Sequence, residues 1–154
     1  MTKNKYLSLL IILSITFIAP AIGGYITTEF KEPWYAEIIK PSFNPPSWVF
    51  APVWSTLYVL MSLAIWRVWL KSLNTKIIKV YFIHLFFNSL WSIFFFGFHK
   101  IGLALFDVII ILIFIGVLMK EYFKIDKFSF YIMIPYFGWS IFAFILNSFI
   151  FYLN

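Results

Sequence analysis

Five long apolar stretches, separated by short polar links, dominate the pattern of residues along the chain. They cover residues 6–28, 49–70, 77–98, 101–119 and 128–153, and each is close to or above the ~20 residues that a helix needs to cross a bilayer. The stretches are apolar throughout instead of alternating at every second residue, which excludes the strands of a membrane barrel. The pattern therefore predicts an all-α membrane protein, a bundle of five transmembrane helices formed by residues 1–154 as a single domain.

The links at 72–76 and 99–100 are too short to hold another domain, so we expect successive helices to be antiparallel neighbours. The first stretch also has features of a signal peptide, because Lys3 and Lys5 precede the apolar run and residues 19–21 resemble a cleavage site. The apolar run continues past that site, however, and reaches spanning length if it is retained. We favour a transmembrane helix.

The link at 29–47 is longer than the others and is rich in proline and aromatic residues. Pro41 and Pro45 push the residues before them toward extended geometry, so a stiff, irregular segment is expected here. Ser47 is expected to cap the next helix, and Pro52, just inside that helix, to disturb it locally. We interpret residues 29–47 as an external lid over any cavity between the helices.

The composition agrees with a membrane location, since 63% of the residues are hydrophobic and only 12% are charged. A soluble domain of this length would carry about twice that share of charge. The chain has no cysteine, which excludes disulfides, thiolate metal sites and thiol nucleophiles. The net charge of +6 does not indicate nucleic-acid binding, because the cations lie at the ends of the apolar stretches.

The cations are unevenly divided between the two ends of the predicted bundle. Nine of the twelve lie before the first stretch or near the links that follow the second and fourth, and three lie on the other side, at Lys31, Lys40 and Lys100. The positive-inside rule then places the N-terminus in the cytoplasm and the C-terminus outside.

Polar and aromatic residues recur at helical spacing inside the stretches. The stripes are Trp54, Tyr58 and Met61; His84, Asn88, Trp91 and Phe95; and Pro135, Trp139, Ala143 and Asn147. In rigid helices, Trp54, Trp91, Asp107 and Asn147 lie at one level of the outer half, above Asn88 and Trp139 near the midplane. Two interpretations remain open: polar contacts that hold helices together, or the walls of a ligand cavity.

Two titratable residues inside the stretches require separate interpretations. A carboxyl group at the depth of Asp107 is costly, so a functional role is the default hypothesis. We expect Asp107 to be protonated or paired within the polar cluster. In the non-functional alternative, Asp107 is a neutral acid bonded to a neighbour such as the indole N–H of Trp91, or water reaches it from the outer face. His84 is either an axial haem ligand or, as is more common, a structural hydrogen-bonding group. No metal site is predicted.

The motifs of the chain resemble those of the translocator protein family, whose members are also called tryptophan-rich sensory proteins and peripheral benzodiazepine receptors. The resemblance covers nearly the whole chain. It is carried by Pro20, Gly23 and Gly24; by Trp34, Tyr35, Lys40, Pro41, Ser42, Pro45 and Pro46; by Pro52, Val53, Trp54, Leu57 and Tyr58; by Asn88, Trp91, Ser92, Phe94 and Phe95; by Gly102, Ala104 and Asp107; and by Pro135, Tyr136, Trp139, Phe142, Ala143, Leu146 and Asn147.

The resemblance implies a bacterial member with five helices, located in the cell membrane and in contact with membrane lipid. It also implies binding of porphyrins, with protoporphyrin IX or haem as a ligand, and of benzodiazepine- or isoquinoline-type ligands. No cofactor is required, no nucleic acid is bound, and a homodimer is expected to be possible. The ligand-binding residues that it implies are Tyr35, Pro41, Pro45, Ala51, Trp54, Tyr58, Asn88, Trp91, Asp107, Trp139, Ala143, Leu146 and Asn147.

Two departures from the family pattern bear on the ligand. The C-terminal cholesterol motif of the family has a basic residue close after a tyrosine, whereas residues 146–154 contain none, so cholesterol recognition through this motif is expected to be poor. Leu103 stands where many members have tryptophan, which removes one aromatic group from the expected pocket.

Two classes of function are compatible with these features. The first is a receptor or sensor that binds porphyrins, with porphyrin transport as a variant of it. The second is an enzyme-like, light- and oxygen-dependent degradation of protoporphyrin IX, in which Trp54 and Trp139 are the candidate redox-active residues.

Overall fold

The structure, a computed structural model, describes residues 5–72 and 75–154, so Lys3 and the centre of the link at 72–76 lie outside the described residues. All regular structure in the described part is helical. The elements are α1 (Lys5–Thr16), α2 (Ile18–Phe30), α3 (Trp34–Glu37), α4 (Ser47–Lys71), α5 (Thr75–Ser92), the π-helical turn η1 (Ile93–Gly97), α6 (Ile101–Ile125) and α7 (Lys127–Leu153). They form five rods that are long and apolar enough to cross a membrane, which confirms the predicted fold class.

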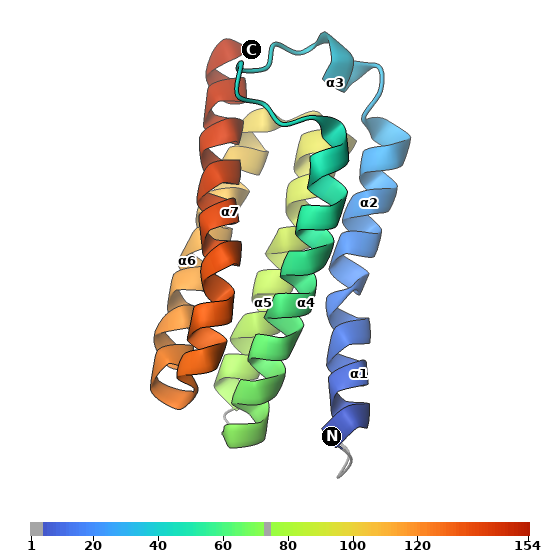
Figure 1. Ribbon diagram of the computed structural model, residues 1–154. Helices are drawn as coiled ribbons and strands as arrows, with labels where there is room; N and C mark the ends of the chain where they lie inside the picture. Colours follow the sequence, from blue (N-terminus) through green and yellow to red (C-terminus); the bar gives the residue numbers. More distant parts are fainter. Residues whose placement is uncertain (1–4, 73–74) are drawn as a thin grey trace.

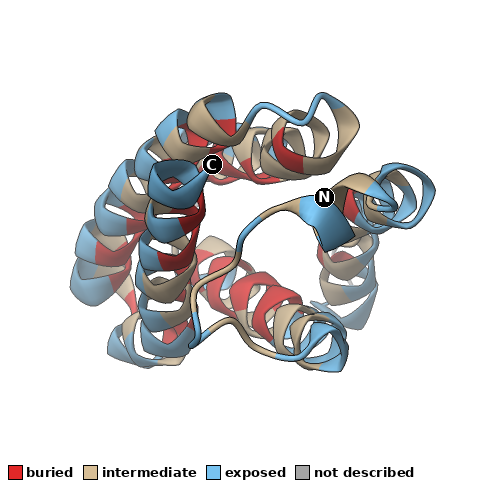
Figure 2. Ribbon diagram, turned by 90° about the horizontal axis from the view of Figure 1, so that it is seen from above, coloured by how far each residue is buried: buried red, intermediate tan, exposed pale blue. Residues whose placement is uncertain are grey.

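Helices α1 and α2 stack end to end as one rod, and the other long helices complete a bundle around a common interior (Figures 1 and 2). Helix α1 packs on α4, whereas α2 packs mainly on α5 and η1, so the rod changes partner along its length. Helix α6 packs between α5 and α7, and α7 packs on α4. The short helix α3 and the segment after it lie across one end of the bundle, here called the α3 end (Figure 1).

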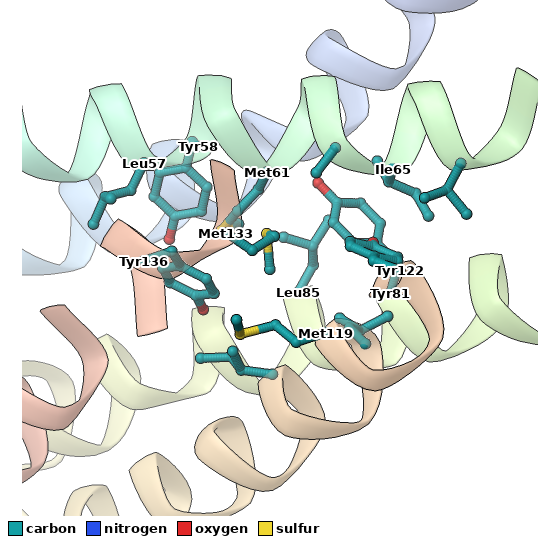
Figure 3. Close-up of a cluster of buried hydrophobic side chains, with 14 of the residues drawn as sticks. Leu57, Tyr58, Met61, Ile65, Tyr81, Leu85, Met119, Tyr122, Met133 and Tyr136 are labelled. Carbon is teal, nitrogen blue, oxygen red and sulfur yellow. The ribbon is translucent and has the colours of Figure 1, made fainter. Parts of the chain in front are cut away.

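The prediction that successive helices are direct neighbours is wrong for α4 and α5, which make few contacts with each other. A cluster of large side chains fills the space between these two helices (Figure 3). Met61, Tyr81, Tyr122, Met133 and Tyr136 are fully buried in this cluster. The bundle is therefore densely packed in the half away from α3.

Several helix boundaries differ from the predicted ones. Pro46, and not Ser47, is the residue before α4, and no side chain caps the helix there. Helix α4 also continues through Pro52 without a break. Helix α6 extends to Ile125 instead of ending at residue 119, because Tyr122 is buried in the core and holds the last turns against it.

Two irregularities change which side chains face the interior. The first rod is interrupted at Phe17, three residues before Pro20. Proline has no N–H to donate to the carbonyl of Thr16 and its ring crowds that carbonyl, which accounts for the interruption. In η1 the N–H of Phe98 donates to the carbonyl of Ile93 (2.8 Å), a spacing of five residues instead of four. The wider turn shifts the faces of the helix after residue 93.

An ion cluster closes the opposite end of the bundle. Asp126, the single residue between α6 and α7, is only 5% exposed. It accepts hydrogen bonds from Arg67 Nε (2.7 Å), Lys71 Nζ (2.6 Å) and Ser129 Oγ (2.7 Å). Burial by itself would raise the pKa of Asp126, but these hydrogen bonds outweigh it and hold the pKa well below its usual range. The cluster ties α4 to the turn between α6 and α7.

We predict that Asp126→Asn lowers the free energy of unfolding by about 2 kcal/mol, because the amide has no charge and only one acceptor oxygen for the three donors. The midpoint of thermal unfolding in detergent should fall by roughly 4–8 °C. Since the folded pKa is depressed, this stabilisation is present above the ordinary Asp pKa of ~3.9 and is lost as the pH falls toward the folded value. Wild type should lose stability below about pH 4, and the variant should lack that part of the loss.

Glu121→Gln is the matched control, because Glu121 pairs with Lys124 (2.7 Å) on the exposed surface of the neighbouring turn. Exposed pairs contribute little, so the midpoint should hardly move. Equal effects of the two substitutions would contradict a special role for Asp126.

Candidate ligand-binding cavity

A cavity of about 410 Å³ lies in the half of the bundle nearest α3. Its size falls within the range of small-molecule sites in proteins. Every long rod and α3 contribute side chains to it. The lining comprises Ala19, Pro20, Gly23, Gly24, Thr27, Thr28, Lys31, Tyr35, Ser47, Phe50, Ala51, Trp54, Ser55, Tyr58, Asn88, Trp91, Ser92, Phe95, Phe96, Val108, Ile111, Trp139, Ser140, Phe142, Ala143, Leu146, Asn147 and Ile150.

The indole of Trp91 forms a fixed part of one wall. Its Nε1 donates a hydrogen bond to Asn147 Oδ1 (3.0 Å), and Asn147 Nδ2 donates to the carbonyl of Ile101 (3.2 Å). The ring stacks on Phe95 at 5.0 Å between centroids and meets Phe96 edge to face at 5.9 Å. Both phenylalanines lie in the π-helical turn η1. The wider turn brings the rings of these two consecutive residues into the same wall of the cavity.

A chain of hydrogen bonds forms the floor of the cavity. The hydroxyl of Tyr58 donates to Asn88 Oδ1, and Asn88 Nδ2 donates to the hydroxyl of Tyr136 (3.0 Å). That hydroxyl also pairs with His84 Nε2 (2.6 Å). The chain links α4, α5 and α7, and it satisfies both ends of the Asn88 amide. His84 is fully buried beneath the floor and does not line the cavity, so it has the expected hydrogen-bonding role.

Trp54 and Trp139 come from different helices and both line the cavity. Trp54 lies on α4, 5.8 Å from the ring of Tyr58 and 6.2 Å from that of Tyr136. Trp139 lies on α7, 5.2 Å from the ring of Phe142. These contacts between rings hold the indoles at defined positions in otherwise apolar surroundings.

Small residues on α2 keep space in the cavity. A Cβ atom on Gly23 would lie 2.9 Å from Ser92 Oγ, so glycine permits the close approach of α2 to α5. A Cβ atom on Gly24 would meet nothing within 4 Å. Gly24 and Thr28 on α2 and Ala51 on α4 line the cavity and are exposed, so the cavity opens between these two helices.

The α3 end is covered by residues 34–46, which comprise α3 and the link to α4 and are here called the covering segment. Trp34 stacks on the ring of His99 (4.4 Å, interplanar angle 13°), and Tyr35 reaches into the cavity lining. Burial raises the pKa of the Tyr35 phenol above its usual value. Further along, the side chain of Asn154 exchanges two hydrogen bonds of 2.9 Å with the backbone of Ile39. The segment is thereby fixed to α7 and to the turn before α6.

Most residues implied by the sequence come together around the cavity. Ten of the thirteen lie in its lining, namely Tyr35, Ala51, Trp54, Tyr58, Asn88, Trp91, Trp139, Ala143, Leu146 and Asn147. Pro41, Pro45 and Asp107 do not. The two prolines belong to the part of the covering segment beyond α3, which packs through Phe43 on the ring of Phe149 of α7 at 5.2 Å.

Two parts of the expectation for Asp107 need correction, namely its place in the cavity lining and its pairing with Trp91. Its side chain is only 2% exposed, and neither carboxyl oxygen has a hydrogen-bond partner within the described residues. The indole of Trp91, proposed as its partner, instead donates to Asn147. Val108 and Ile111 of the same helix line the cavity, whereas Asp107 does not, although it lies only about 40° around the helix from Ile111.

Other lining residues were not singled out as ligand contacts from the sequence. Phe50 and Phe96 lie among so many phenylalanines that no pattern distinguishes them. Lys31 was counted only as a cation beyond the first stretch. The Pro20–Gly24 cluster was the one available signal for the contribution of α2, because small residues and proline leave space beside a helix.

Five membrane-spanning rods with an aromatic cavity at one end define a polytopic integral membrane protein with an intramembrane cavity. Comparison with known proteins gives the family. The sequence pattern of the TspO/MBR family matches residues 10–153, and the chain belongs to this family.

Relatives from distant organisms align along most of the chain. The Tryptophan-rich protein TspO of Archaeoglobus fulgidus is 34% identical over 149 residues, covering 96% of this chain and 94% of that protein. The Tryptophan-rich sensory protein of Cereibacter sphaeroides is 35% identical over 137 residues, covering 88% and 87%. The Translocator protein of Homo sapiens is 30% identical over 139 residues, covering 84% and 82%.

Asn147 has hydrogen-bond partners and Asp107 has none among the described residues, so we predict opposite effects on stability when each is replaced by leucine. Asn147→Leu leaves the indole N–H of Trp91 without its acceptor, so the free energy of unfolding should fall by about 1–3 kcal/mol. Asp107→Leu removes a buried polar group that has no partner in the described structure, and stability should stay the same or increase. Unfolding midpoints in detergent measure both. Destabilisation by Asp107→Leu equal to that by Asn147→Leu would show that Asp107 has a partner.

Proposed function

We propose that this protein is a membrane receptor or sensor that binds flat aromatic macrocycles, with porphyrins such as protoporphyrin IX as the ligand class. The observation that carries the proposal is the arrangement of Trp54, Trp91 and Trp139 around one cavity. Flat rings stack well on indoles, and a mainly apolar cavity with a few polar groups is typical of ligand sites. The name of the relative from Cereibacter sphaeroides, a sensory protein, supports the same class of function.

The polar groups of the cavity favour binding over hydrolytic chemistry. The amides of Asn88 and Asn147 are already hydrogen-bonded to protein groups, and no carboxylate lines the cavity in the described residues. These amides can shape and orient a ligand, but they offer no general base or nucleophile. Benzodiazepine- and isoquinoline-type molecules, which are also flat and aromatic, fit the same proposal.

A second candidate function is light-driven porphyrin chemistry, favoured by the two indoles of Trp54 and Trp139 in the lining. A photoexcited porphyrin can take one electron from an indole and pass it to dioxygen, which yields an indole radical cation and superoxide. The described lining contains no cysteine, methionine or histidine, so indoles and phenols are its oxidisable side chains.

Substituting the indoles distinguishes the two candidates. In Trp54→Phe and Trp139→Phe most of the ring area remains, so the affinity for protoporphyrin IX should fall by about tenfold or less, ~1.4 kcal/mol. Quenching of the remaining tryptophan fluorescence measures this affinity. If the protein also degrades the porphyrin, a new chromophore should form in light with wild type and should nearly disappear with either variant.

Trp69→Phe is the control, because Trp69 does not line the cavity. It should match wild type in affinity and in any light reaction. Absence of saturable porphyrin binding to wild type would contradict the receptor proposal. Bleaching at the rate of free porphyrin in every sample would remove the second candidate and leave the first.

A further inference from the structure

Lys31 is the one charged residue in the cavity lining within the described part of the chain. It follows the last residue of α2 and lies beneath the covering segment, with 26% of its side chain exposed. Its Nζ atom is 5.4 Å from the centre of the Tyr35 ring, which also lines the cavity. A single positive charge therefore lies at the α3 end of an otherwise uncharged cavity.

Most of the other polar groups that line the cavity have partners in the protein, and Ser140 Oγ, which has none among the described residues, is uncharged. Asn88 and Asn147 are held by protein groups at the floor and the wall. Lys40, the neighbouring cation, donates hydrogen bonds to the backbone carbonyls of Tyr35 and Ile38 and does not line the cavity. Lys31 is thus the group through which this cavity can recognise charge.

The present partner of Lys31 does not hold it firmly. Its Nζ atom lies 3.4 Å from Glu32 Oε1, and the Glu32 side chain is 57% exposed. Ion pairs of this kind contribute little in water. A ligand anion inside the cavity lies in a less polar environment, where its attraction to the same cation is stronger.

We infer that Lys31 binds a carboxylate of the ligand at the α3 end, so that the site selects flat aromatic molecules with an acidic group on one edge. This inference rests on the proposed function and specifies its ligand class. The aromatic body lies between the indoles, and the carboxylate points toward Lys31 and the covering segment. Glu32 competes with the ligand for the same cation and repels its carboxylate.

The test compares protoporphyrin IX, which has two carboxylates, with its uncharged dimethyl ester. Binding to wild type, Lys31→Met, Lys31→Arg, Glu32→Gln and Lys100→Met is measured by tryptophan quenching in uncharged phosphatidylcholine nanodiscs. The ratio of the two affinities in each variant is divided by the same ratio in wild type, which cancels the different partition of the two ligands into lipid. Lys100→Met is the matched control, because it removes a cation at the same end of the bundle but outside the cavity.

In wild type the acid should bind more tightly than the ester. Lys31→Met should reduce that preference by about fivefold, the factor that corresponds to ~1 kcal/mol. Lys31→Arg and Lys100→Met should keep the preference, and Glu32→Gln should increase it. Unchanged preference in Lys31→Met, with both porphyrins still bound, would overturn the inference alone. Binding of neither porphyrin to wild type would overturn the proposed function and this inference with it.

Discussion

The hydrogen-bonded chain from Tyr58 through Asn88 and Tyr136 to His84 separates the densely packed half of the bundle from the half that contains the cavity. Polar groups buried in a membrane need partners within the protein, and these four side chains bond to one another across α4, α5 and α7. On one side of the chain, large side chains fill the interior (Figure 3). On the other side, α2 departs from α4 to pack on α5 and η1, and the cavity remains between them.

The cavity combines rigidity with an almost neutral lining. Trp91 is fixed by Asn147, the floor amide is satisfied at both ends, and the covering segment is held by the stack of Trp34 on His99. Side chains that are already in place lose little freedom when a ligand binds, which favours affinity for a flat, rigid molecule. In our proposal, Lys31, the one charged lining residue in the described part of the chain, sets the orientation of the ligand and the selectivity more than the total binding energy.

Hydrophobic length and helical spacing were sufficient to predict the five spans and the faces that carry Trp54, Asn88, Trp91 and Asn147. They were insufficient wherever a helix departs from regular geometry or a side chain lies near the edge of a face. Asp107 lies one turn before the lining residue Ile111, about 40° away around the helix, and spacing does not resolve that difference. The π-helical turn at Ile93–Gly97 has no local signal, and the role of Lys31 depends on contacts between segments that follow only from the tertiary structure.

The central claim is that the ligand occupies the cavity between α2, α4 and α7, and filling the cavity tests it most directly. Ala143 lines the cavity on α7, whereas Ile141 on the same helix is exposed on the outside of the bundle. The measurement is the affinity of protoporphyrin IX for Ala143→Phe and Ile141→Phe in nanodiscs, with unfolding midpoints showing that both variants are folded. The account predicts at least about a tenfold loss of affinity, ~1.4 kcal/mol, for Ala143→Phe and none for Ile141→Phe. Wild-type affinity in a folded Ala143→Phe protein would contradict it.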